Sequence, residues 1–139
     1  MSDDIRGLDD VLRFDWERVR ADEVVVHWTV TERHLQPFGL VHGGIYCYVN
    51  ESTASMGGQV FVGDEKVVVG VNNNTDFIGQ AGPGDTLTSR ATPVHQGRSS
   101  QLWLIETRGS AGALVARGHV RLTNLDRAAP KGTADAIRR

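Results

Sequence analysis

The chain has 139 residues, a net charge of −2 at pH 7 and an ordinary globular composition, 40% hydrophobic and 23% charged. This length fits one domain with a single core. No apolar run approaches the roughly 20 residues of a membrane helix, and the acidic start Met1-Ser2-Asp3-Asp4 does not resemble a signal peptide. The single cysteine, Cys47, excludes an internal disulfide framework and suits a reducing compartment. We therefore expect a cytoplasmic protein that makes no use of a membrane.

The charged residues divide the chain into an acidic body and a basic end. Residues 127–139 hold four basic side chains and one acidic one, so the remainder of the chain carries the negative charge. A nucleic-acid binder needs a basic face, which an acidic body does not supply. The C-terminal segment also has few large apolar residues. We predict one domain over residues 1–125 and a flexible tail over residues 126–139.

The first half of the chain predicts one strand and one buried helix. An amphipathic segment over residues 11–16 precedes strict alternation over residues 24–31, which is typical of a half-buried strand. Residues 33–39 contain a proline and a glycine and are predicted to form a loop. The alternation disappears over residues 43–58, where most side chains are small or apolar. This pattern predicts a largely buried helix that ends at the pair Gly57-Gly58.

Four further strands are predicted in the second half. They cover residues 67–77, 85–95, 101–107 and 114–123, with turns rich in glycine between them. A strand, a helix and four strands with short connections predict an α+β domain, in which an antiparallel sheet surrounds one helix.

The junction between the loop and the helix carries residues suited to acyl chemistry. His42-Gly43-Gly44 begins the predicted helix, where the first amides lack intrahelical partners and the helix dipole favours negative charge. In the preceding loop, the side-chain amide of Gln36 can polarise a carbonyl. A tight turn and a solvated glutamine are the alternative interpretations of these residues.

Glu51 is the candidate nucleophile or general base. It lies among apolar residues of the predicted helix, where a carboxylate is costly unless it is paired or hydrogen-bonded. The alternative is an exposed stripe, with Glu51 paired to an arginine. Ser55 follows one turn later on the same face and can bind the carboxylate or a water molecule. Together these residues supply the parts that acyl transfer requires.

The segment from His34 to Gln59 resembles the signature of hotdog-fold thioesterases. Within it, a proline-glycine loop leads to His-Gly-Gly, and Glu51 follows His42 by nine residues, as in that family. The nearest branch is the phenylacetate-pathway type, related to the Arthrobacter-type hydroxybenzoyl-CoA thioesterase. The resemblance continues through residues 67–74 and 93–103 and spans roughly residues 24–125. It implies a hotdog fold and hydrolysis of an acyl-CoA to the free acid and CoA, with no cofactor and no metal.

The resemblance also implies a role for each site residue. Glu51 is the nucleophile or base, Gly44 the backbone donor to the oxyanion, and Ser55 the partner of the attacking water. Gln36 and His42 orient and polarise the thioester carbonyl. The family implies homodimers or homotetramers, with each site at the interface between subunits.

A predicted hairpin at Gly97, Arg98 and Ser99 lies where relatives hold the nucleotide end of CoA. Turn amides, hydroxyls and an arginine suit a phosphate group. A solvated hairpin arginine is the alternative. The tract Asn72-Asn73-Asn74 departs from the apolar residues that are usual in this strand.

Several interpretations remain open. A non-catalytic acyl-CoA-binding protein and a hotdog hydratase or dehydratase are the competing functions. The acyl group, and the choice between CoA and a carrier protein, are undetermined. Three aromatic residues could line the acyl site or pack the core: Tyr46, Tyr48 and Trp103.

Overall fold

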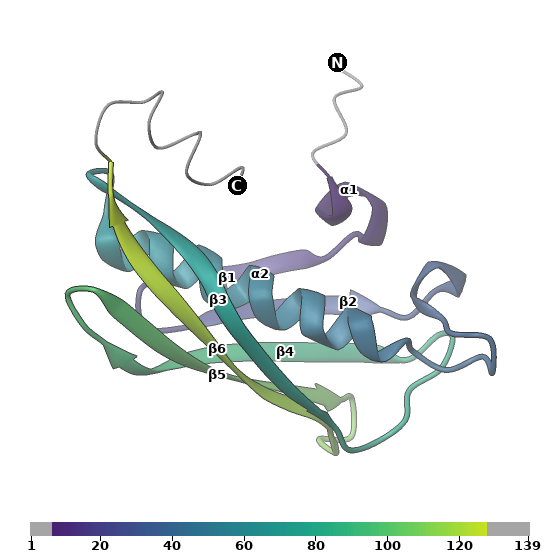
Figure 1. Ribbon diagram of the computed structural model, residues 1–139. Coiled ribbons are helices and arrows are strands. Elements are labelled where there is room, and N and C mark those ends of the chain that lie inside the picture. Colours follow the sequence, from purple (N-terminus) through teal and green to yellow (C-terminus); the bar gives the residue numbers. More distant parts are fainter. Residues whose placement is uncertain (1–6, 128–139) are drawn as a thin grey trace.

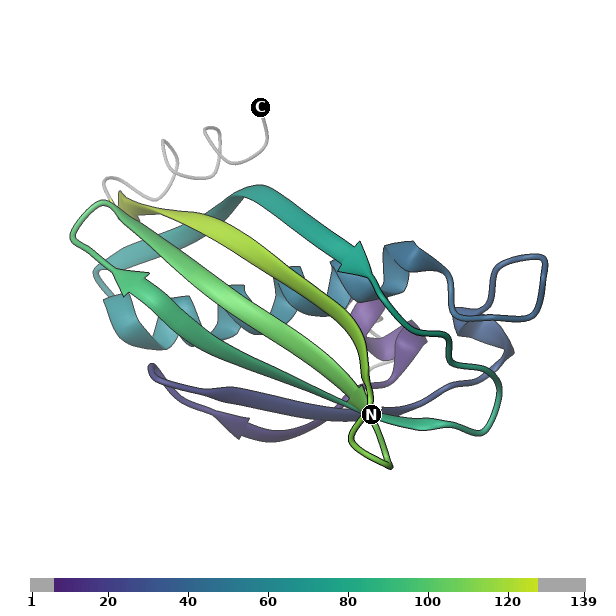
Figure 2. The ribbon, with the colours of Figure 1, turned by 90° about the horizontal axis from the view of Figure 1, so that it is seen from below.

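A long helix, α2 (Gly43–Val62), lies inside a curved six-stranded sheet in the computed structural model, which describes residues 7–127 (Figure 1). The sheet has the order β1-β2-β4-β5-β6-β3, and all neighbouring strands are antiparallel. Its strands are β1 (Asp15–Val19), β2 (Val24–Thr29), β3 (Lys66–Phe77), β4 (Thr86–Gln96), β5 (Ser100–Gly109) and β6 (Leu114–Asp126). Seen from below, the strands wrap around the helix (Figure 2). The predicted α+β hotdog fold is confirmed.

Strand β1 was not predicted, because its pattern imitates a helix. Trp16 and Val19 both pack toward the core although they lie three positions apart. A β-bulge between Trp16 and Arg18 supplies the extra residue that interrupts the alternation. The predicted amphipathic segment is therefore divided between a short helix, α1 (Leu8–Leu12), and this edge strand.

The glycine pair Gly57-Gly58 does not end the helix, contrary to the prediction. Helix α2 continues to Val62 and is capped by Gly63, whose φ of 75° is left-handed. A Cβ on Gly57 would lie 2.5 Å from the Trp103 ring, and one on Gly58 would collide with Leu122. The two glycines therefore serve the close approach of helix and sheet.

The core forms two clusters along α2. One surrounds Trp28 and Tyr46 near the beginning of the helix, and the other surrounds Trp103 and Leu122 near its end. Trp103 is fully buried, and its Nε1 donates to Gln101 Oε1 at 2.9 Å. Trp103 therefore packs the core.

The predicted boundary of the domain falls within the last strand. Asp126 still belongs to β6, and the remainder of the predicted tail, residues 128–139, lies outside the described residues. Within residues 7–127, no helix has the length and apolar character needed to cross a membrane.

The contact between Gly57 and Trp103 generates a stability prediction. We expect Gly57→Ala to lower the free energy of unfolding by about 1–2 kcal/mol, because overpacking outweighs the roughly 1 kcal/mol gained in helix propensity. Chemical denaturation measures the change. Gly109→Ala is the matched control, because a Cβ there meets no atom within 4 Å. A Gly57→Ala variant as stable as this control would contradict the packing argument.

Candidate active site

The side chain of His42 caps the start of α2, a role that the sequence analysis did not predict. His42 is the N-cap, and its Nδ1 accepts a hydrogen bond of 2.8 Å from the amide of Gly44. The amide of Gly44 is thus already engaged. The amide of Gly43 has no hydrogen-bond partner among the described residues, and the positive end of the helix dipole lies there.

Gln36 and Gly43 line the same cavity, of about 370 Å³. The Oε1 atom of Gln36 accepts from the amide of Phe38, which leaves the Nε2 group as a donor. The ring of Phe77 covers Gly43 closely, since a Cβ on Gly43 would lie 2.6 Å from it. The remaining lining is mostly apolar, and includes Leu40, Val41, Tyr46 and Ile78. Two amide donors therefore lie beside an apolar, aromatic space.

Tyr46 and Tyr48 have different environments. Tyr46 is 2% exposed, and its ring lies between Trp28 and Phe77. Burial and the hydrogen bond to Asp9 raise the pKa of Tyr48 to about 12, so this phenol stays protonated. Tyr48 attaches α1 to α2, whereas Tyr46 both packs the core and lines the cavity.

Glu51 is half-buried on the side of α2 that faces β3. Its Oε1 lies 3.5 Å from Asn73 Nδ2, and a Cβ on Gly70 would lie 2.6 Å from its Oε2. Within residues 7–127, Glu51 forms no ion pair with an arginine. Its side chain is partly exposed in the single chain. Ser55 is half-buried one turn further along the helix, and within residues 7–127 it forms no hydrogen bond with Glu51.

The helix separates Glu51 from the donors at its start. Glu51 lies eight positions after Gly43, which corresponds to about 12 Å along the axis at 1.5 Å per residue. A carbonyl in hydrogen-bond contact with the Gly43 amide is therefore out of reach of the carboxylate of the same chain.

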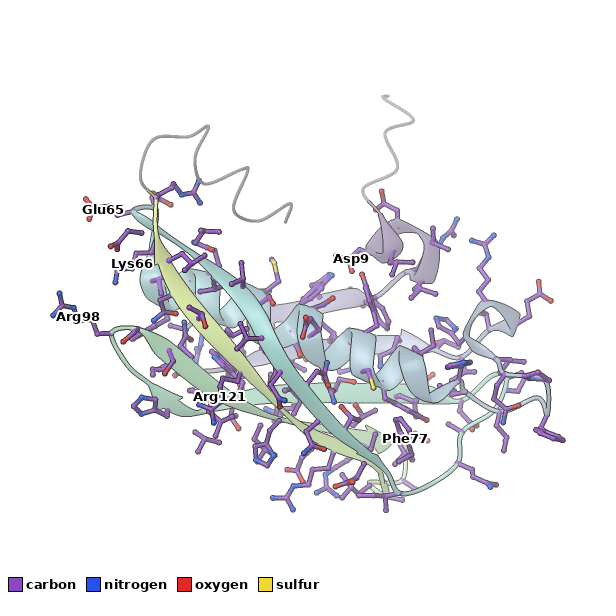
Figure 3. The ribbon with its side chains drawn as sticks, viewed as in Figure 1. Asp9, Glu65, Lys66, Phe77, Arg98 and Arg121 are labelled. Atoms are coloured by element: carbon purple, nitrogen blue, oxygen red, sulfur yellow. The ribbon has the colours of Figure 1, made fainter. Side chains whose placement is uncertain are left out.

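Gly97, Arg98 and Ser99 form the turn between β4 and β5, as predicted. Figure 3 shows Arg98 and Lys66 at the end of the sheet opposite Phe77. The carbonyl of Arg98 accepts from Lys66 Nζ and from Asn124 Nδ2, both at 3.2 Å. Lys66 thus adds a second positive charge to the turn. The sequence did not predict this, because the two residues lie 32 positions apart.

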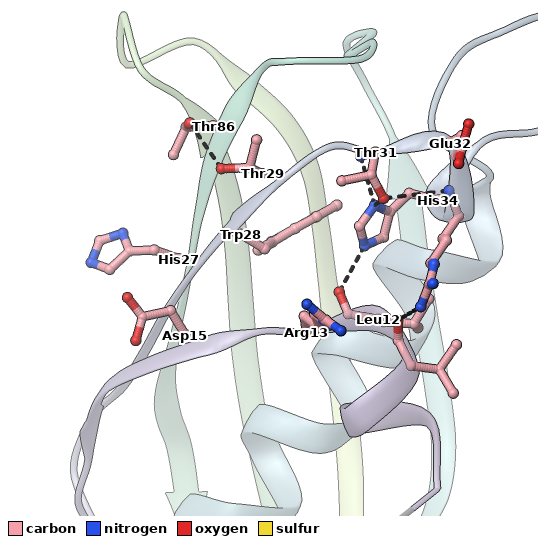
Figure 4. Close-up of a pocket in the computed structure, with 12 residues that line it drawn as sticks. Leu12, Arg13, Asp15, His27, Trp28, Thr29, Thr31, Glu32, His34 and Thr86 are labelled. Atoms are coloured by element: carbon pink, nitrogen blue, oxygen red, sulfur yellow. Dashed lines mark hydrogen bonds between the residues drawn. The ribbon is translucent and has the colours of Figure 1, made fainter. Parts of the chain in front are cut away.

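A larger cavity, of about 600 Å³, lies elsewhere (Figure 4). It is bordered by α1, β2 and the short 3-10 helix η1 (Glu32–His34). Its polar groups already bind each other: His34 Nε2 lies 3.0 Å from Leu12 O, and His34 Nδ1 accepts from Thr31 N at 2.9 Å. Neither Glu51 nor Gly43 reaches this space. We therefore locate the candidate site by its chemistry and not by cavity size.

Several known proteins resemble this chain over most of its length. The sequence profile described as "Thioesterase superfamily" matches residues 38–116. Three similar proteins are informative. The structure of AziG from S. sahachiroi is 47% identical, with a TM-score of 0.83, over 86% of this chain and 96% of that one. The Mycobacterium tuberculosis protein Rv1847 is 40% identical over 121 residues, 85% of this chain and 86% of its own, and its structure gives a TM-score of 0.83. A 1,4-dihydroxy-2-naphthoyl-CoA hydrolase of Listeria monocytogenes is 31% identical over 100 residues, 72% of this chain and 80% of its own.

Proposed function

Because the chain belongs to the thioesterase superfamily, we propose that it hydrolyses an acyl-CoA at a site shared between two copies of itself. One observation carries this proposal. Within the described residues, Glu51 is a half-buried carboxylate without a cationic partner, and Gly43 and Gln36 provide two unengaged amide donors on the same helix and its entry loop. These are the groups that thioester hydrolysis needs.

The donors bind the thioester carbonyl. Its oxygen accepts hydrogen bonds from Gly43 N–H and Gln36 Nε2, and the helix dipole stabilises the negative charge that develops there. The role first predicted for Gly44 passes to Gly43, because Gly44 N–H is bound by His42. His42 then holds the turn that presents the Gly43 amide.

The carboxylate of Glu51 supplies the attack. It either attacks the carbonyl carbon directly or removes a proton from a water molecule that Ser55 helps to hold. In the first route the C–S bond breaks, CoA leaves as the thiol, and the acyl group forms an anhydride with Glu51 that water then hydrolyses to the free acid. In the second route the water attacks the carbonyl carbon, the C–S bond breaks, and CoA and the free acid leave. Both routes consume one water molecule and need no metal.

A second copy is proposed to bring the two halves together. Strand β3 is paired only with β6 in the described chain, so its other edge is a template for a further strand. Apolar side chains on β3 and on α2 are strongly exposed: Met56 is 46% exposed, Val60 50% and Val71 55%. A two-fold pairing of β3 edges would set the α2 helices antiparallel and place Glu51 beside the partner's Gly43. Two such dimers could form a tetramer.

The lining of the cavity favours an aromatic acyl group. The rings of Tyr46 and Phe77 border it with their centroids 6.2 Å apart. The Listeria relative is named for an aromatic acyl-CoA. The resemblance to the phenylacetate-pathway branch implies the same class of substrate and stays a prediction. The nucleotide of CoA would lie at the turn of Gly97, Arg98 and Ser99.

Replacement of the carboxylate tests the chemistry. We expect Glu51→Gln to keep the fold and to lower kcat by about 100-fold or more, since it removes the only proposed nucleophile or base. Thiol release from aromatic and medium-chain acyl-CoAs measures the rate. It also separates hydrolysis from hydration, which releases no thiol, and from passive binding. Glu32→Gln makes the same change at an exposed site and should leave kcat intact. Unchanged turnover in Glu51→Gln would exclude this role.

Mixing two inactive variants tests the shared site. Glu51→Gln and Gln36→Ala should each be impaired, the second by about 100-fold, as when one oxyanion donor is removed. After dissociation and reassociation of a mixture, half of the dimers contain both variants, and each of these has one intact site. We expect about a quarter of the wild-type activity to return. Light scattering establishes the assembly. An active monomer, or mixed dimers without recovered activity, would contradict the shared site.

Arg98→Ala tests the position of the nucleotide. A phosphate contact far from the thioester contributes equally in the ground and transition states, so its loss should raise KM and leave kcat unchanged. The salt dependence of KM should also weaken. Arg117→Ala, an exposed arginine on β6, is the control. The KM of a pantetheine thioester, which lacks the nucleotide, should not respond to Arg98→Ala. Equal changes for both substrates would place the phosphate elsewhere.

A further inference from the structure

Only the central residue of the tract Asn72-Asn73-Asn74 directs its side chain to the helix. Asn73 Nδ2 donates to the carbonyl of Cys47 at 2.8 Å and contacts Glu51 Oε1 at 3.5 Å. Asn72 and Asn74 lie one position away on either side, so their side chains point to the other face of the sheet. An amide nitrogen has two hydrogens, so it can donate to both acceptors.

The register of β3 brings Asn73 and Gly70 to the same face. Residues three positions apart normally face opposite sides of a strand. The register shifts between Gly70 and Asn72, so that Val71 is an extra residue. Gly70 is paired with Leu122 and Asn73 with Val120, and both partners are buried toward the helix. Gly70 leaves space for one carboxylate oxygen of Glu51, and Asn73 contacts the other.

The orientation of the Asn73 amide is set by its neighbours. The carbonyl of Cys47 can only accept, so the nitrogen end of the Asn73 amide faces the helix, and Thr75 Oγ1 donates to Asn73 Oδ1 at 2.8 Å. Thr75 Oγ1 in turn accepts from Asn50 Nδ2 at 3.1 Å. A chain of donors therefore runs from Asn50 through Thr75 and Asn73 toward the carboxylate of Glu51. Hydrogen bonds aligned in this way strengthen one another.

This series of hydrogen-bonded side chains lowers the stability of the fold. Asn50 is 1% exposed, and its Oδ1 is buried without a partner in the described part of the protein. An unpaired buried acceptor destabilises a protein, so its presence indicates a purpose other than packing.

We propose that Asn73, oriented by Thr75, is the positioning residue that aims and stabilises the carboxylate of Glu51. The inference rests on the proposed role of Glu51. A glutamate has several rotatable bonds, and a shared site requires its carboxylate to point across the interface toward the partner's carbonyl. The space at Gly70 and the N–H of Asn73 restrict it to one direction, which lowers the entropy lost on reaching the transition state.

Substitutions within the tract test this role. Asn73→Asp keeps the size and the bond from Thr75 but replaces the donor by a second carboxylate. We expect kcat to fall about 10-fold or more, the loss typical of a hydrogen bond to a charged group, with KM changed less than about twofold. Asn72→Asp and Asn74→Asp add the same charge on the opposite face and should leave kcat intact. Equal kcat values for all three variants would overturn the proposal.

Variants of Thr75 test whether the Asn73 amide must be oriented by a hydrogen bond, or whether its presence is enough. Thr75→Val has nearly the same shape and suits a strand, but it cannot donate to Asn73 Oδ1. We expect Thr75→Val to lower kcat about 10-fold. Thr75→Ser keeps the hydroxyl and should have the kcat of the wild type. Thermal unfolding identifies any general loss of structure. Full activity in Thr75→Val would show that the amide needs no orienting partner and would overturn the chain of donors.

A double-mutant cycle distinguishes this proposal from the proposed function. If Asn73 acts through Glu51, Asn73→Ala should slow the wild type but have no further effect in a Glu51→Gln background. Additive losses would overturn the positioning role while leaving Glu51 as the active group. If Glu51→Gln itself keeps the wild-type kcat, the proposed function fails and this inference fails with it.

Discussion

An α-helix advances about 1.5 Å per residue, and Glu51 follows Gly43 by eight positions on α2, a distance of about 12 Å along the axis. No side-chain movement closes that distance, because both groups belong to one rigid element. The amides at the helix start and the carboxylate at its middle therefore cannot act on one carbonyl in one chain. The edge of β3 beside Glu51 allows a symmetrical solution. In a two-fold dimer with antiparallel α2 helices, the N-terminus of each helix would lie beside the middle of the other. The proposed chemistry therefore requires the proposed assembly, which would also cover the exposed apolar side chains of β3 and α2.

Local features of the sequence were sufficient for most elements of the fold. The helix start at Gly43 was predictable because capping chemistry is local, and five strands followed from alternation. The failures arose from contacts between distant residues. Strand β1 contains a bulge that gives Trp16 and Val19 a helical spacing. The pair Gly57-Gly58 resembles a helix end but instead admits Trp103 and Leu122, which follow about 45 and 64 positions later.

The candidate site divides in the same way. The spacing from His42 to Glu51 lies within one helix and was readable from the sequence. The amide that His42 engages was not, because an N-cap side chain can bind the amide of the second or of the third helical residue, here Gly44 or Ile45. The contact of Asn73 with Glu51 depends on the extra residue at Val71, since regular alternation places Gly70 and Asn73 on opposite faces. Sequence reasoning could notice the unusual asparagines but could not decide which of them faces the helix.

The C-terminal part and the middle of α2 pack differently against the sheet, and this difference explains how the fold accommodates a polar site. Toward its C-terminus, Gly57 and Gly58 let the helix pack directly on Trp103 and Leu122, both fully buried. Toward its middle, β3 presents Gly70 and Asn73 in place of larger apolar residues, and the Oδ1 of Asn50 has no partner among residues 7–127. Close packing at one end holds the helix against the sheet, so the looser and more polar part need not contribute to that attachment. A carboxylate borne on such an anchored element keeps its position even though its own surroundings are half open, which is the condition for a preorganised catalytic group.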